Sequence, residues 1–127
     1  MTKEITAELV GKALNQWMTA NTHVLELAPD TLEVATLARD AMGETVYCFV
    51  EARADHYEVS DDGRCLFKLD PSASDEALYQ LAAGLAGDAG FHLNAANGVL
   101  SAMTEAAELL PKIVALAQLQ VVISFLQ

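Results

Sequence analysis

The side chains with the clearest capacity for chemistry are acidic. Asp40 precedes the triplet Glu51-Ala52-Arg53, and alternate residues of a strand share one face, so Glu51 and Arg53 are expected side by side. Pairs of carboxylates hold Mg²⁺ in nucleases. Sites of that kind normally place a lysine beside the second acid, and this triplet has none. A metal-dependent nuclease is therefore an alternative hypothesis and not the leading one.

A second group of acids lies close together in the sequence around a predicted turn. Its members are Glu51, Asp55, Glu58, Asp61 and Asp62. Their spacing differs from the regular oxygen-ligand spacing of a calcium loop. We therefore predict a solvated acidic face that binds a partner, and we predict no metal site and no cofactor.

Nucleophilic chemistry has little support. The chain has no G-x-S-x-G motif and no glycine-rich phosphate loop, and its three histidines are scattered. Cys48 and Cys65 stand in apolar stretches without metal-ligand spacing, so buried free thiols are expected. A pairing of either cysteine with His56 is the alternative left open. No catalytic residue is predicted.

The charge balance is the unusual property of the composition. The 127 residues include 18 acidic and 7 basic side chains, which give a net charge of −11. The basic residues are scattered singly, so direct binding to nucleic acid is not expected. The electrostatic field of this net negative charge favours approach to a basic protein surface. Acidity that serves only solubility is the alternative.

The elements that must position these acids are expected to form one α+β domain over residues 1–127. Apolar residues at helical spacing predict a helix from Lys3 to about Ala20, with Thr2 as its N-cap. Short β-rich runs separated by turn residues then predict an antiparallel sheet of about five strands. The runs are His23–Ala28, Leu32–Ala38, Glu44–Arg53, Tyr57–Ser60 and Arg64–Leu69. Asp61-Asp62-Gly63 predicts a hairpin between the last two.

Helices are expected to follow and to pack on the sheet. One begins after Ser74, with Asp75 and Glu76 in its first turn, and ends near Gly87 or Gly90. A small hairpin is expected around Asn97-Gly98, and the chain is expected to be helical after Ser101.

The last predicted helix, Ile113 to Gln127, carries no charged residue and is apolar most of the way round. Either the sheet and other helices cover it, or it forms a homodimer interface through Ile113, Leu116, Val122 and Phe125. The run is shorter than the about 20 residues of a membrane span. The first residues lack the apolar run of a signal peptide, so a cytoplasmic location is expected.

The order of these features resembles a known family. An early helix with Trp17, the strands, the segment Tyr57-Glu58-Val59-Ser60-Asp61-Asp62-Gly63, Gly90-Phe91 and an apolar closing helix are similar to the bacterial and phage family called domain of unknown function 1828. The resemblance spans nearly the whole chain. It implies an α+β fold and a connection with mobile genetic elements or host defence, and it implies no catalytic residue.

The leading functional hypothesis is a non-enzymatic acidic protein-binding module, encoded by a phage or mobile element. In its most specific form, the acidic face acts as an inhibitor or DNA mimic against a basic, nucleic-acid-processing partner. The alternatives are the nuclease-like enzyme and an oligomeric structural domain.

Overall fold

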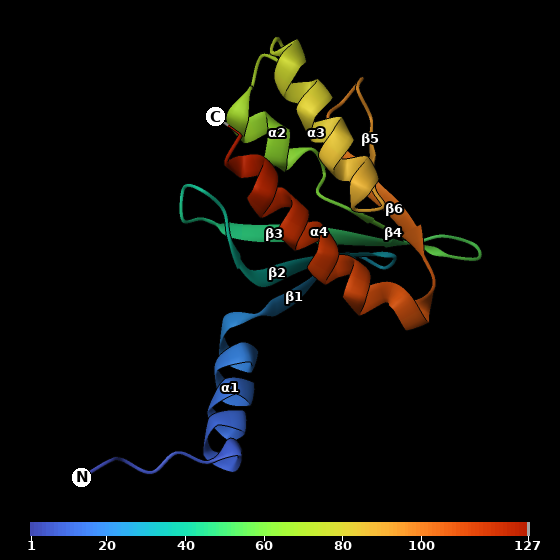
Figure 1. Cartoon of the computed structure of the whole chain (residues 1–127). Coiled ribbons are helices and arrows are strands. Elements are labelled where there is room, and N and C mark those ends of the chain that lie inside the picture. Colours follow the sequence, from blue (N-terminus) through green and yellow to red (C-terminus); the bar gives the residue numbers. More distant parts are fainter. Residues whose placement is uncertain (127) are drawn as a thin grey trace.

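A six-stranded antiparallel sheet forms the centre of the computed structural model, which describes residues 1–126 (Figure 1). The strands are β1 (His23–Ala28), β2 (Thr31–Arg39), β3 (Thr45–Ala52), β4 (Tyr57–Ser60), β5 (His92–Leu93) and β6 (Leu100–Thr104), in the spatial order β1-β2-β3-β4-β6-β5. The helices are α1 (Ala7–Asn21), α2 (Arg64–Leu69), α3 (Glu76–Asp88) and α4 (Leu109–Ser124), with a 3₁₀ turn at Ala106–Glu108. The predicted α+β class is confirmed, with six strands in place of about five.

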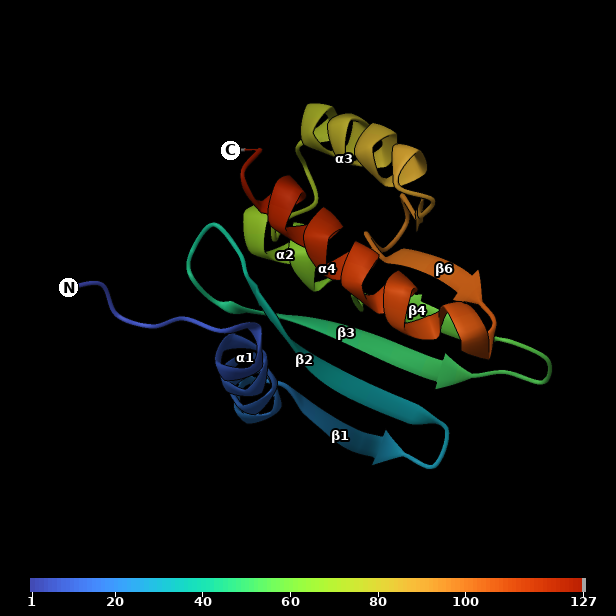
Figure 2. The same ribbon diagram turned by 60° about the horizontal axis from the view of Figure 1, so that its bottom comes forward.

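The helices divide between the two sides of the sheet. In Figures 1 and 2, α2, α3 and α4 gather on one side, and α4 runs across the strands. The first helix, α1, extends from the β1 edge on the other side and points away from the rest of the molecule. The N-terminal helix is therefore present as predicted, but it stands apart from the helical layer.

Strand β3 occupies the middle of the sheet, as its apolar residues on both faces predict. Val46, Cys48 and Val50 are buried beneath α4. Tyr47 and Phe49 point to the other face, where the Arg64 guanidinium lies 5.3 Å and 4.9 Å from their ring centres. A cation placed over an aromatic face in this way stabilises the fold modestly.

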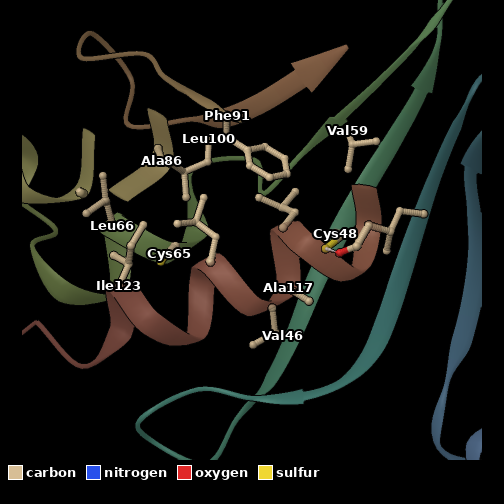
Figure 3. Close-up of a cluster of buried hydrophobic side chains, with 14 of the residues drawn as sticks. Val46, Cys48, Val59, Cys65, Leu66, Ala86, Phe91, Leu100, Ala117 and Ile123 are labelled. Carbon is tan, nitrogen blue, oxygen red and sulfur yellow. Dashed lines mark hydrogen bonds between the residues drawn. The ribbon is translucent and has the colours of Figure 1, made fainter. Parts of the chain in front are cut away.

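The core lies between α4 and the sheet (Figure 3). Leu116, Ala117 and Ile123 of α4 pack with side chains from β3, β4, β6, α2 and α3. These partners include Val46, Cys48, Val59, Leu66, Ala86, Phe91 and Leu100. Full burial of one leucine or isoleucine stabilises a fold by about 1.5 to 3 kcal/mol. The closing helix is thus a core helix.

This position decides between the two predictions for the closing helix. Ile113 and Leu116 are 6% and 0% exposed, so their assignment to a subunit interface is wrong. Val122, on the outer side of α4, and Phe125, which follows the last residue of α4, are exposed. The segment Ala106–Ser124 is long and apolar enough to cross a bilayer, but the core helix of a soluble protein passes the same test.

The prediction of a strand at Arg64–Leu69 is wrong, because the turn before it begins a helix. Asp62 and Gly63 both have positive φ, at 56° and 76°, as a tight hairpin would require. However, the Asp61 carboxylate accepts hydrogen bonds from the backbone N–H groups of Gly63 and Cys65. This local capping turns the chain into α2.

Strand β6 takes the place in the sheet that the sequence assigned to Arg64–Leu69. It pairs with β4, with Val59 opposite Ala102, and with β5, with Leu93 opposite Leu100. The small hairpin predicted between β5 and β6 is confirmed. The prediction of a helix directly after Ser101 is wrong, because these residues complete the sheet first.

Helix boundaries differ from the prediction in two further places. α1 begins at Ala7 and is capped by Thr6, whose hydroxyl accepts the N–H of Leu9 at 3.0 Å, so Thr2 is not the cap. α4 begins at Leu109, with Pro111 in its first turn, where the missing N–H costs no helical hydrogen bond.

Candidate interaction surfaces

Acidic side chains from separate segments meet where β3 ends and β4 begins. We call this region the acidic sheet end and define it as Asp30, Glu51, Asp55, Glu58 and Glu105. The strand register brings them together: Glu51 pairs with Thr31 on one side and with Glu58 on the other, and Tyr57 pairs with Thr104. The N–H of Ala52 also donates to the carbonyl of Asp30 at 2.8 Å.

One arginine offsets part of this charge. Glu51 and Glu58 lie directly opposite each other on neighbouring strands, where like charges repel. Arg53 bridges them, with Nη2 at 3.1 Å from Glu51 and 3.4 Å from Glu58. All three side chains are a third or more exposed, so each pair contributes little to stability. The acidic sheet end keeps a clear excess of negative charge.

The turn between β3 and β4 adds a hollow to this surface. The hollow, of about 440 Å³, is lined by residues 52–57 together with Glu105 and Ala106. Asp55 is 88% exposed, and its carboxylate lies 2.7 Å from Nδ1 of His56. That hydrogen bond lowers the pKa of Asp55, so the carboxylate stays charged at neutral pH. The hollow therefore has the size and charge to receive a basic side chain.

Asp61 does not belong to this surface, and its assignment to an exposed acidic face is wrong. It is 0% exposed and accepts hydrogen bonds from the backbone N–H groups of Gly63, Cys65 and Leu100. Burial raises the pKa of Asp61, against the effect of these donors. Asp62 is exposed, but it follows the opposite end of β4.

The structure thus joins Glu51, Asp55 and Glu58 and separates them from Asp61 and Asp62. Asp30 and Glu105 also belong to the acidic sheet end, but the sequence did not identify them. In an antiparallel meander, the β1–β2 turn and the β3–β4 turn lie at the same end of the sheet. The predicted order of strands was therefore a signal that Asp30 lies near Asp55. Glu105 had none, because the segment before it was predicted to be helical.

The nuclease alternative has no geometric support. Asp40 lies before the first residue of β3 and Glu51 near its last, which separates them by about 20 Å along the strand. Asp40 instead accepts the N–H groups of Met42 and Glu44 and binds Lys68 Nζ at 3.0 Å. Among residues 1–126, no three His, Cys, Asp or Glu side chains are grouped to hold a metal ion.

A second hollow lies beside the Asp40–Lys68 pair, near Tyr47, Arg64 and Gln120. Its volume of about 140 Å³ is well below the about 300 Å³ of the smallest usual ligand pockets. It has room for a few water molecules and is a poor candidate for a substrate site.

Both cysteines are packing residues. Cys48 Sγ lies 3.6 Å from the carbonyl of Ile113, and Cys65 Sγ lies 3.6 Å from that of Gln120. Burial raises the pKa of each thiol to about 12. His56 is bonded to Asp55 in the β3–β4 turn. A cysteine–histidine nucleophile therefore has no support.

A second surface of different character is the N-terminal arm, which we define as residues 1–28, containing α1 and β1. Its large apolar side chains are exposed: Ile5, Leu9, Val10, Leu14, Trp17, Met18, Val24, Leu25 and Leu27. Within the described chain, α1 contributes no buried residue. The helical spacing predicted the apolar face of α1, but it did not predict that this face would lie open.

Comparison of the chain with protein-family models, with curated proteins and with solved structures finds no match. The resemblance to the domain of unknown function 1828 family therefore stays a prediction.

Proposed function

We propose that this protein is a non-enzymatic, acidic protein-binding module that occupies a basic site on a nucleic-acid-processing partner. The observation that carries the proposal is the acidic sheet end, where the strand register gathers five acidic residues from separate segments and two of them, Asp55 and Glu105, line an open hollow. In its most specific form, this surface competes with nucleic acid as an inhibitor or DNA mimic. The family resemblance adds a phage or mobile-element origin, and the two free cysteines favour a cytoplasmic location.

Electrostatics supports the proposal at two ranges. At long range, a net charge of −11 steers the chain toward a basic surface and raises the rate of encounter. At contact, Asp55 is charged and exposed. Glu51 and Glu58 lie opposite each other on adjacent strands, with their Cβ atoms about 5 Å apart. A groove that binds a phosphate backbone presents lysine and arginine side chains to such carboxylates.

Charge-neutral variants test the proposal by affinity capture from a bacterial lysate. The test variant carries Glu51→Gln, Asp55→Asn and Glu58→Gln. The control carries Asp62→Asn, Glu76→Gln and Asp88→Asn, which remove the same number of exposed charges elsewhere. We expect the test variant to lose a partner that the wild type and the control retain at low salt and release at high salt. Capture that ignores salt, or equal loss in both variants, would contradict the proposal.

A further inference from the structure

We propose that two copies of this chain associate through the N-terminal arm, with β1 of each copy pairing edge to edge and the two α1 helices covering each other's apolar faces. This inference concerns a surface separate from the acidic sheet end and does not depend on the function proposed above. It also moves the homodimer interface away from the C-terminal helix.

The first argument is the amount of apolar surface on the arm. Trp17 on the apolar face of α1 is 55% exposed, and Leu25 of β1, whose register places it on the sheet face away from α4, is 56% exposed. Helix α1 projects away from the sheet, so no other described element of its own chain covers this face (Figures 1 and 2). Exposed apolar side chains in this number on one segment favour an interface.

The second argument is the open edge of β1. It is the first strand in the sheet order, so the backbone groups on its outer side lack a strand partner within residues 1–126. Proteins usually protect such an edge with charged residues, with proline or with a β-bulge. The strand His23–Ala28 contains neither proline nor lysine, its one carboxylate is Glu26, and its register shift lies at its far end, between Glu26 and Ala28. The edge over residues 23–26 is therefore suited to pair with another strand.

The third argument is charge, which selects a second copy over a basic partner. The arm carries two lysines and three glutamates, a net charge of −1. The remaining residues carry a net charge of −10. Two chains that each carry −11 repel each other most where the acids gather, and least where the arm lies. The arm therefore offers self-association at low electrostatic cost and offers nothing that would attract a basic protein.

The size and symmetry of the arm also fit. Its 28 residues match the about 20 to 30 residues that one side of a standard interface uses. Antiparallel pairing of two β1 strands forms a two-fold, self-complementary contact and continues the sheet across both copies. The two-fold axis is then perpendicular to the sheet, so both α1 helices lie on the same face of the joined sheet.

Charge also limits the strand register. Residues that lie directly opposite each other in an antiparallel pair have their side chains on the same face of the sheet. In a two-fold symmetric pair of identical strands, this requires one residue to lie opposite its own copy, and the axis passes between those two residues. A register centred on Glu26 would place two carboxylates together. A register centred on Leu25 places two leucines together and sets Val24 beside Glu26 of the other copy. We expect the Leu25 register.

The test is sedimentation velocity on the full chain over a wide range of concentration. The arm variant carries Leu9→Glu and Leu14→Glu. The control carries Phe67→Glu and Leu110→Glu, which alter residues that are as exposed but lie outside the arm and outside the acidic sheet end. We expect a dimer for the wild type and the control and a monomer for the arm variant, with the same circular dichroism for all three.

Two readouts report on the arm itself. Trp17 is the only tryptophan of the chain, so its emission should shift to the red as the wild type is diluted and dissociates. Leu25→Cys should form a disulfide-linked dimer on oxidation, while Met103→Cys should not. Cys48 and Cys65 are buried, with each thiol pKa raised to about 12, and do not compete.

A wild type that stays monomeric at high concentration would overturn the proposal. So would a dimer that survives in the arm variant and is lost in Val122→Glu, Phe125→Glu, since that result would place the interface on α4. Neither result would affect capture of a basic partner by the acidic sheet end. Conversely, loss of that capture in the Glu51, Asp55 and Glu58 variant should leave the dimer intact.

Discussion

The Asp61 carboxylate accepts a hydrogen bond from the backbone N–H of Leu100 at 2.9 Å, although the two residues lie 39 positions apart. The backbone N–H of Asp61 donates in return to the carbonyl of Leu100 at 3.1 Å. The same carboxylate accepts the N–H groups of Gly63 at 2.8 Å and Cys65 at 3.1 Å. One buried side chain thus fixes the exit of β4, the start of α2 and the start of β6.

Replacement of Asp61 by alanine should lower the free energy of unfolding by about 3 kcal/mol or more, because three buried N–H groups lose their acceptor and each costs about 1 to 3 kcal/mol. Urea denaturation followed by circular dichroism measures the change. Asp62→Asn is the control, since Asp62 is exposed and asparagine accepts a positive φ. It should change stability by less than about 0.5 kcal/mol. Equal effects of the two variants would contradict this role of Asp61.

The strands of the first half were predictable because each has its own β-rich run and its own turn. The segment Asp61-Asp62-Gly63 led to the wrong prediction of a hairpin because its dihedral angles suit a hairpin turn. Only the burial of Asp61 against β6 directs the chain into α2 instead. The acidic sheet end was predictable only in part, because local sequence signals place some of its residues and not others. Glu51, Asp55 and Glu58 follow from one hairpin, whereas Glu105 depends on the pairing of β4 with β6, which leaves no local signal.

Lys68→Met should raise the pKa of Asp40. Burial acts to raise this pKa, but the hydrogen bond from Lys68 and the N–H groups of Glu44 and Met42 outweigh it, so the pKa lies below its ordinary value of 3.8. Because the folded-state pKa is depressed, the stability that ionised Asp40 contributes is present above 3.8 and is lost as the pH falls through the lowered value. In the variant the folded-state pKa lies nearer to 3.8, so this contribution should be smaller and should be lost over a narrower range of pH.

A titration of the carboxyl carbons by NMR measures this change residue by residue. Asp55 provides the control within the same sample, because its lowered pKa depends on His56 and not on Lys68. An Asp40 midpoint that is identical in the wild type and in Lys68→Met would contradict the assignment.

Both thiols should resist modification in the folded protein. A thiolate is the reactive form, and burial holds the pKa of Cys48 and of Cys65 near 12, so both are protonated at pH 8. A chromogenic disulfide reagent should label neither thiol in buffer and both in concentrated urea. Rapid labelling of either cysteine under native conditions would show that its surroundings open on the timescale of the reaction.

Arg53→Ala should strengthen the capture of a basic partner while changing stability by less than about 1 kcal/mol, because the ion pairs that it removes are partly exposed. The variant leaves Glu51 and Glu58 without the cation that offsets them. Arg39→Ala makes the same change of charge at the opposite end of β3, where Arg39 bonds Thr45, and should have a smaller effect. Capture that responds equally to both variants would indicate that net charge, and not the acidic sheet end, determines binding.

The pairing of β4 with β6 has a consequence during protein synthesis. Residues 57–60 leave the ribosome about 40 residues before their second neighbour, residues 100–104, has been translated. At about 5 to 20 residues per second, the outer edge of β4 stays unprotected for roughly 2 to 8 s. The nascent chain therefore carries two unsatisfied strand edges during this interval, β1 and β4, and only the latter is closed by its own polypeptide.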